Sequence, residues 1–300
     1  LGFYNTLLHD LATTRTKESL SGIGTAVGYF GLVVGLGLAY PFTQGTLSFF
    51  GFSGKPTAFI IGALAFLLFS LPVFFFLKDK KDETPASEIA TFGKSFGDTF
   101  RDIKNIRQYP GVLAYLISYY LYSDAILTLQ LFAVLYLDKV AHLADSQKNI
   151  AFATGLFFGV VGAGTSRWLA LLMKSTRKAV ALCIALWAVL LVALGLVSNP
   201  YAFIVIVVLN GFFSGALFSL SRAYYSHLVP AEKQGQYFGI YVLFERFASI
   251  LGPLIWSLTI IAFAFLGEAA SYRAAMLSLG VMVAIGFVIF LQVKDPRTKE

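Results

Sequence analysis

Charged residues are scarce in this chain. Only 13% of its 300 residues are Asp, Glu, Lys or Arg, whereas 57% are hydrophobic, and the mean hydropathy is +0.74. A soluble domain carries about 25% charged residues, so this chain cannot cover its own surface with polar groups in water. The composition excludes a soluble enzyme, a disordered tail and a collagen-like chain, and it indicates a protein surrounded largely by lipid.

Cysteine and histidine are also rare. The single cysteine, Cys183, excludes an internal disulfide and a CxxC metal site. His9, His142 and His227 are isolated, with no second ligand at helical spacing, so we expect no metal. Residues 51–56 (GFSGKP) lack the spacing of a phosphate loop and place a proline after the lysine. We therefore expect no cofactor and no enzymatic activity, and any pumping must draw on a gradient.

A start methionine and a cleavable leader are not visible either. The chain opens with Leu1 and shows no basic segment that leads into an apolar run and a cleavage site. We therefore expect that the amino end of the protein lies upstream of Leu1.

Long apolar runs recur along the chain. Each has at least 19 residues, close to the ~20 that a helix needs to cross a ~30 Å hydrocarbon core. Barrel strands would be about 10 residues long with strict alternation, which these runs lack. We predict an all-α membrane protein with eight transmembrane helices, and residues 1–13 are the tail of a ninth. The predicted spans are 22–42, 56–77, 111–137, 149–173, 179–197, 201–221, 237–266 and 274–293.

The basic residues between these runs predict the orientation. Most of the 23 Lys and Arg residues fall in alternate loops, on the side that holds both chain ends. The opposite loops contain Lys55, Lys139, Lys148 and Arg273. Because cytoplasmic loops are enriched in Lys and Arg, we predict that both ends are cytoplasmic, in the inner membrane if the source is bacterial. The net charge of +7 then reflects topology and not nucleic-acid binding.

The longest loop, 78–110, divides the chain. It opens with a charged run, and apolar residues then recur at spacings of three and four with basic residues between them. This pattern is typical of an amphipathic helix that lies on headgroups or packs on the cytoplasmic ends of the bundle. We predict a cytoplasmic linker here, a six-helix half at 111–293 and a cytoplasmic tail at 294–300. Residues 1–77 are then the remnant of a preceding six-helix half.

Glycines recur in small-x-x-x-small pairs, which allow helices to approach closely in lipid. For any single pair, static packing is a better interpretation than sliding during transport. The pairs are Gly24/Gly28, Gly31/Gly35, Gly155/Gly159 and Gly211/Gly215.

Charges inside the predicted spans are few and costly, which makes them candidates for a binding site. Asp124 lies roughly 20 Å along its span and Arg246 roughly 14 Å along its own, both counted from the cytoplasmic side. We predict that both face a central cavity, where Asp124 partners Arg246 or a substrate amine. Glu245 cannot share a helix face with Arg246 and needs its own partner or a proton. A structural ion pair between two helices is the alternative.

Polar side chains extend the predicted substrate or coupling-ion site. Tyr120 and Gln130 flank Asp124, Asn210 lies in the middle of its span, and Tyr241 lies one turn before the charged pair. For any single tyrosine, a place in an interface belt is the alternative, and for Asn210 it is a hydrogen bond between helices.

Three stretches carry a resemblance to known proteins. They are residues 3–31 (FYN through the glycines of the first span), residues 121–124 (LYSD), and residues 221–253 (SR through YFGIY to LGP). They are similar to the major facilitator superfamily, and more closely to its UMF branch, which is related to fungal vacuolar amino-acid exporters. The resemblance implies that these spans are the fifth to twelfth of a 12-span fold, with two six-helix halves that rock about a central site.

The resemblance also implies a cytoplasmic gating motif in the loop after the span 149–173. The matching stretch keeps the basic residues Lys174, Arg177 and Lys178. Met173 stands where an acid is expected and Thr176 where a glycine is expected. This departure argues against an acid-based latch at the loop.

Together these features predict a secondary active transporter that moves a small solute by alternating access, and the resemblance implies amino-acid efflux. The expected partners are the solute, protons or another coupling ion, and membrane lipids, for a protein that we expect to be monomeric. A membrane-embedded lipid-modifying enzyme is one alternative, although it would need clustered acids or histidines at the membrane boundary. A scaffold that does not transport is the other.

Overall fold

The computed structural model describes residues 17–43, 45–48, 55–76, 109, 111–141, 143–230 and 233–293. The predicted stub at 1–13, the linker at 78–110 apart from Tyr109, and the tail at 294–300 lie outside these residues. The chain divides into two compact units, one of residues 1–29 and 98–300 and the other of residues 30–97. Each unit is described by itself below.

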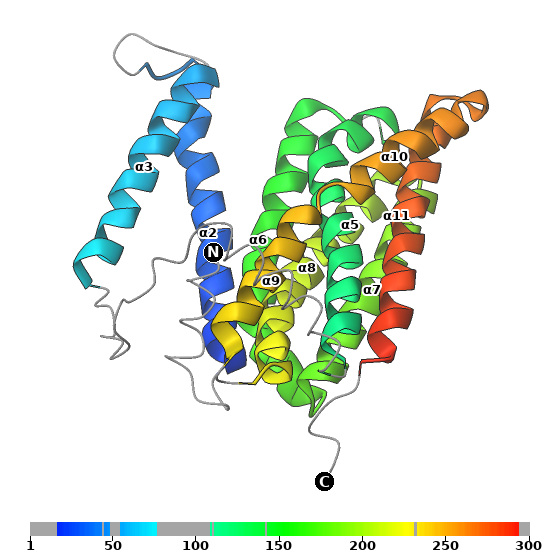
Figure 1. Ribbon diagram of the computed structural model, residues 1–300. Coiled ribbons are helices and arrows are strands. Elements are labelled where there is room, and N and C mark those ends of the chain that lie inside the picture. The colour runs from blue at the N-terminus through cyan, green and yellow to red at the C-terminus, as the bar shows by residue number, and fades with distance from the viewer. Residues whose placement is uncertain are drawn as a thin grey trace, which may run out of the picture. The chain divides into compact units, whose positions relative to one another are not determined.

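The larger unit is a bundle of helices (Figure 1). In it, α6 packs along α8, α7 packs against α8 and α11, and α11 packs against α5. The first part of α2 (Lys17–Thr43), up to Tyr29, also belongs to this unit. The other helices are α5 (Val112–Lys139), α6 (Asp145–Leu172), α7 (Thr176–Leu196), α8 (Pro200–Leu228), α9 (Gln234–Phe247), α10 (Leu251–Ala262), the short η3 (Ala264–Leu266) and α11 (Glu268–Leu291).

The smaller unit holds the rest of α2 and α3 (Lys55–Phe76). An apolar groove lies between the two helices, lined by residues such as Leu38 and Phe42 of α2 and Leu64 and Leu68 of α3. Most of the described side chains of this unit are exposed, including Phe59 and Phe66 of α3.

Helices occur at all eight predicted spans. Within the part of the chain that the structure describes, seven spans are long and apolar enough to cross a membrane, and α3 contributes a shorter apolar stretch, Phe59–Leu71. Lipid offers no hydrogen-bond partners to a backbone, so each crossing segment must satisfy its own N–H and C=O groups as a helix. The predicted all-α membrane bundle is confirmed.

One predicted span is not continuous. The sequence indicates a single helix over 237–266, but the structure has two, α9 and α10, with a break at Ala248–Ile250. Pro253 lies in the first turn of α10, where its missing N–H is tolerated. An apolar run shows that a segment crosses the membrane but does not show where the backbone turns, and hydropathy alone therefore misses this break.

Glycines bring α6 and α8 together. A Cβ atom at Gly211 would overlap the carbonyl oxygen of Gly155, and one at Gly215 would overlap that of Gly159. These two pairs therefore have the close-packing role that their spacing predicts. In α2, by contrast, a Cβ at Gly28, Gly31 or Gly35 would meet no atom within 4 Å in the described structure.

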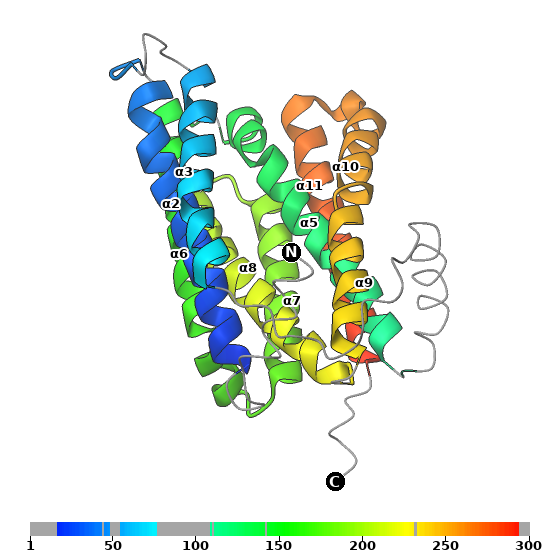
Figure 2. The same cartoon turned by 60° about the vertical axis from the view of Figure 1, so that its left-hand side comes forward.

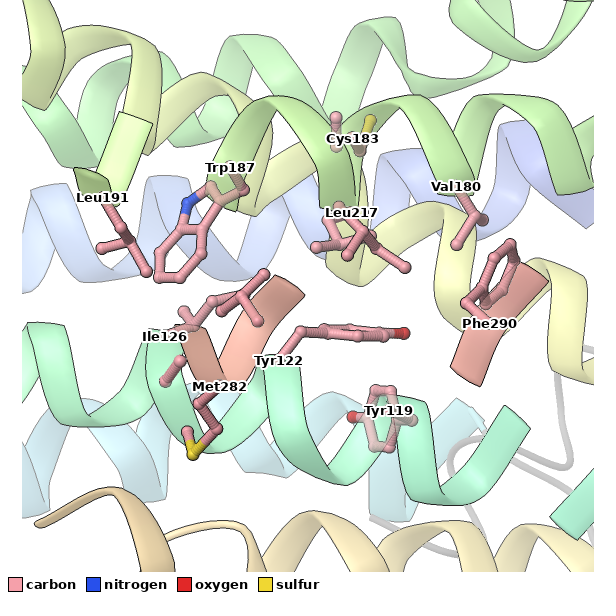
Figure 3. Close-up of a cluster of buried hydrophobic side chains, with 14 of the residues drawn as sticks. Tyr119, Tyr122, Ile126, Val180, Cys183, Trp187, Leu191, Leu217, Met282 and Phe290 are labelled. Atoms are coloured by element: carbon pink, nitrogen blue, oxygen red, sulfur yellow. The ribbon is translucent and has the colours of Figure 1, made fainter. Parts of the chain in front are cut away.

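The core of the larger unit is aromatic and tightly filled. Trp187 of α7 is 1% exposed and its indole Nε1 donates a hydrogen bond to the Asn210 carbonyl of α8 at 3.3 Å. Side chains from α5, α7, α8 and α11 meet in this core (Figure 3), namely Tyr119, Tyr122, Ile126, Val180, Cys183, Trp187, Leu191, Leu217, Met282 and Phe290.

The loops of the larger unit gather at its two ends. At one end, Lys139 pairs with Glu268 at 2.8 Å, and Arg273 donates to the Val197 carbonyl at 2.7 Å. At the other end, Arg177 donates to the Leu291 carbonyl at 2.9 Å. The loops that follow α5, α7 and η3 are therefore separated from those at the start of α7 and the end of α11, as the predicted alternation of spans requires.

Candidate functional site

A pocket opens between α5, α6, α7 and α8 in the larger unit. It encloses about 740 Å³ of empty space, counting the part that is open to the outside. Its wall is mostly apolar and aromatic, with Phe152 of α6 and Trp187 of α7 among the lining residues. A few polar groups in a largely apolar hollow are typical of a small-molecule site.

Asn210 gives the pocket its most distinctive polar group. The residue is 6% exposed, and its Nδ2 donates to the Ile206 carbonyl at 3.0 Å. Its Oδ1 has no hydrogen-bond partner among the described residues. A buried acceptor left unpaired costs about 1–3 kcal/mol, so this oxygen is poised for a donor that arrives with a ligand.

Three further polar side chains line the same pocket. Gln130 of α5 is exposed there, and Tyr29 of α2 lies beside Ser214 of α8, whose hydroxyl donates to the Gly211 carbonyl at 2.9 Å. The structure thus brings together two of the residues that the sequence predicted, Gln130 and Asn210. Tyr29 was not predicted, because its place in the pocket depends on how α2 packs against α6 and α8. Trp187 was not predicted either, since a tryptophan in an apolar run reads as core.

Asp124 lies elsewhere, against the start of α10. It is fully buried, its Oδ2 accepts the Gly252 N–H at 2.9 Å, and its Oδ1 accepts the Thr128 hydroxyl at 3.3 Å. The Tyr120 hydroxyl approaches the Leu251 N–H in the same turn of α10. The structure does not bring Asp124 to Arg246, which is exposed on α9.

Glu245 has a partner on α5. Its carboxylate lies close to the Tyr119 hydroxyl and near the positive charges of Arg246 and Arg222. Tyr241, one turn earlier on α9, stacks on Tyr119 with ring centroids 4.3 Å apart. Glu245 and Tyr241 therefore form an α5–α9 contact that is separate from the pocket around Asn210.

The first turns of α2 make a polar junction with α7 and α8. Glu18 accepts the Thr176 hydroxyl at 2.7 Å, and His227 Nδ1 lies 3.9 Å from the same carboxylate. Arg222 donates to the Ser21 carbonyl at 2.9 Å. An acid thus faces the loop before α7, although it comes from α2 and not from position 173.

The three basic residues predicted to gate lie around this loop. Lys174 has a left-handed backbone conformation with φ +53° and is exposed, as is Lys178. Arg177 binds the carbonyl end of α11. The structure places these residues at the same end of the bundle as the junction of α2 with α7 and α8, but not in a direct contact with Glu18.

Comparison with known proteins identifies relatives over almost the whole chain. The profile of a family described as "Vacuole effluxer Atg22 like" matches residues 7–300. The chain is 24% identical over 308 residues to "Uncharacterized MFS-type transporter YxiO" of Bacillus subtilis (strain 168). This alignment covers 99% of this chain and 68% of that protein. It is 26% identical over 300 residues to an uncharacterized protein of Aquifex aeolicus (strain VF5), at 97% and 68% coverage.

Fungal proteins match as well. The chain is 23% identical over 316 residues to "Autophagy-related protein 22" of Yarrowia lipolytica (strain CLIB 122 / E 150). This alignment covers 95% of this chain and 52% of that protein. The chain thus spans about half the length of this fungal relative and about two thirds of the bacterial ones.

Proposed function

Because the chain belongs to the family of Atg22-like vacuole effluxers, we propose that it is a secondary active transporter whose solute binds in the pocket between α5, α6, α7 and α8. The family and the relative named as MFS-type support an integral, multi-pass membrane transporter over the enzyme alternative. The observation that carries the proposal is the pocket itself, with the unpaired Asn210 Oδ1 at its wall.

We further propose that the solute is an amino acid or a similar small molecule and that the transporter catalyses its efflux. The family description names effluxers, which supports the direction. The pocket offers amide and hydroxyl groups from Gln130, Asn210, Tyr29 and Ser214 in a mostly apolar wall. Such a wall fits a small solute with an apolar body and a few hydrogen-bonding groups. Since no nucleotide-binding motif is present in the sequence, a proton or another ion gradient would drive the movement.

We propose that both chain ends are cytoplasmic and that residues 111–293 form the carboxy-terminal half of the transporter. The grouping of loops supports this orientation. The loops that are poor in Lys and Arg lie at one end of the larger unit. The contact of Thr176 with Glu18 and that of Arg177 with the Leu291 carbonyl lie at the other end. Under this orientation, a reagent that cannot cross the membrane reaches Lys233 only from the cytoplasm.

Solute counterflow in proteoliposomes tests the function. The purified protein is reconstituted with an excess of one unlabelled amino acid inside, and accumulation of the labelled amino acid is followed across a panel of twenty. We expect counterflow for a subset of the panel, and faster movement when a proton gradient is imposed. Protein-dependent counterflow of none of the panel would overturn the assignment of amino acids.

Replacement of the pocket amide tests the site. Among the buried side-chain acceptors of the described residues, Asn210 Oδ1 is the one at the pocket wall that lacks a partner. Asn210→Ala removes it, so we expect KM to rise by about 3-fold to 10-fold, as the loss of about 1 kcal/mol predicts. Asn199→Ala is the matched control, because Asn199 caps α8 by accepting the Tyr201 N–H at 2.9 Å, away from the pocket. Equal KM values for the two variants would remove Asn210 from the site.

A further inference from the structure

The break between α9 and α10 interrupts a membrane-spanning segment, Gln234–Ala262. Figure 2 shows α9 continuing into α10 beside α5. Within the described structure, α10 packs against α5 and α11, whereas α9 packs mainly against α5. A helix that starts inside the membrane presents free N–H groups in its first turn, and lipid cannot satisfy them. These donors therefore need partners within the protein.

The first turn of α10 leaves two donors to be satisfied. Pro253 has no N–H, and the Leu254 N–H reaches the Ile250 carbonyl at 3.3 Å. Leu251 and Gly252 remain. The Gly252 N–H donates to Asp124 Oδ2 at 2.9 Å, and the Leu251 N–H lies close to the same carboxyl group. A helix is usually capped by the residue just before its first turn. Here Asp124, from a different helix, α5, has that role for α10.

The surroundings of Asp124 are shaped for this contact. Thr128, one turn later on α5, donates its hydroxyl to Oδ1 at 3.3 Å. A Cβ atom at Gly252 would overlap Thr128 Oγ1 and would lie 2.6 Å from Asp124 Oδ1. The Asp124 carboxyl group is fully buried at the first turn of α10, where the positive end of the helix dipole favours a negative charge. Both of its oxygens are therefore already engaged, which leaves little capacity for a solute.

We propose that Asp124 is a positioning residue for transport, which fixes the start of α10 on α5 and makes the break the pivot about which α9 moves. α10 is held on two sides, by α5 and α11, and its first turn is held by the side-chain cap of Asp124. α9 is held by side chains of its neighbours: Tyr241 stacks on Tyr119 of α5, and the Tyr225 hydroxyl of α8 donates to the Tyr237 carbonyl at 2.9 Å. α9 thus has no cap on its backbone comparable to the one that Asp124 places on α10. The inference rests on the proposed function only for its transport readout.

The structural readout uses a cysteine at the break. Ala248 is fully buried there, and the native Cys183 is also buried, so Ala248→Cys reports opening by its rate of maleimide labelling. We expect Asp124→Ala to speed this labelling about tenfold and Asp124→Asn less, because the asparagine oxygen still accepts one N–H. Asp138→Ala on the same helix is the control, since it breaks the pair with Lys148 and leaves α10 untouched. Unchanged labelling in Asp124→Ala would overturn the capping role.

A second route reaches the same contact from α10. Gly252→Ala should displace the carboxylate and speed the labelling as Asp124→Ala does, because its Cβ takes the space that Thr128 and Asp124 occupy. Gly239→Ala on α9 is the control, since a Cβ there meets no atom within 4 Å in the described structure. Variants are compared only if they elute as wild type from size-exclusion chromatography, and equal labelling of the two glycine variants would contradict the proposal.

The transport readout separates positioning from solute binding. We expect Asp124→Asn to lower the maximal rate of counterflow about fivefold and to leave KM within about twofold, opposite to Asn210→Ala. A raised KM, or a full rate that no longer responds to a proton gradient, would instead make Asp124 a solute-binding or proton-binding group. If wild type itself shows no transport, the proposed function fails, while the labelling of Ala248→Cys still decides whether Asp124 caps α10.

Discussion

Arg222 shows how a charged side chain is accommodated among the helices of this bundle. Its Nη2 donates to the Ser21 carbonyl at 2.9 Å and its Nε donates to Ser21 Oγ at 3.1 Å. Ser21 Oγ in turn donates to the Ser219 carbonyl at 2.7 Å. The guanidinium thereby joins α8 to the first turns of α2 with donors in a fixed fork, which a lysine ammonium cannot reproduce.

Replacement of Arg222 tests this junction. Arg222→Lys keeps the charge but loses the paired contacts to Ser21, so we expect unfolding in detergent to become easier by about 1–2 kcal/mol. Arg246→Lys on the exposed face of α9 should change stability by less than about 0.5 kcal/mol. Thermal unfolding followed by tryptophan fluorescence measures both variants, and an Arg222→Lys protein as stable as Arg246→Lys would contradict the account.

Among single residues, the sequence predicted which polar residues line the pocket better than it predicted which groups a buried charge contacts. Gln130 and Asn210 were recognisable as pocket candidates because an amide in a membrane span is costly and stands out in an apolar run. The partner of Asp124 was not recognisable, because the cap on α10 exists only once two helices meet. A glycine and a proline at positions 252 and 253, within an apolar run, were the signal that could have indicated the break.

Helix packing is tightest between α6 and α8. Gly162 extends the glycine contact described above, because a Cβ there would overlap the Phe212 carbonyl. Nearby, Ser166 Oγ and Ser219 Oγ share a hydrogen bond of 2.8 Å. Small side chains at three- and four-residue spacing let the two backbones touch, and this pair of helices forms one wall of the pocket. Hydropathy predicted where these helices lie, and the glycine spacing predicted that they pack closely.

A glycine substitution at this interface should separate the two helices. Gly215→Ala places a methyl group on the Gly159 carbonyl, so we expect a loss of about 1–3 kcal/mol of stability and a lower yield of folded protein. Gly164→Ala on α6 adds a methyl group into open space and should stabilise the helix by about 0.5–1 kcal/mol. Unfolding temperatures in detergent compare the two, and a Gly215→Ala protein that unfolds no earlier than Gly164→Ala would refute this packing.

At the scale of the whole molecule, hydropathy predicted the helical architecture, and the charge pattern predicts its orientation. The physical reason is that lipid forces each crossing segment into a helix, and the alternation of basic loops then fixes how successive helices run. The pocket could not be predicted in the same way. Its wall combines α5, α6, α7, α8 and Tyr29 of α2, and only packing brings these residues to one place.

Access to the pocket from both sides of the membrane tests the central claim most directly. Gln130 is exposed in the pocket, and the native Cys183 is buried. In the Gln130→Cys variant, an impermeant maleimide therefore labels only the introduced cysteine. The account predicts labelling in right-side-out and in inside-out vesicles, with transported solute slowing the reaction, while Lys233→Cys is labelled only from the cytoplasmic face. Labelling of Gln130→Cys from one side only, unchanged by any solute that the protein exchanges, would contradict a pocket that opens alternately to the two sides.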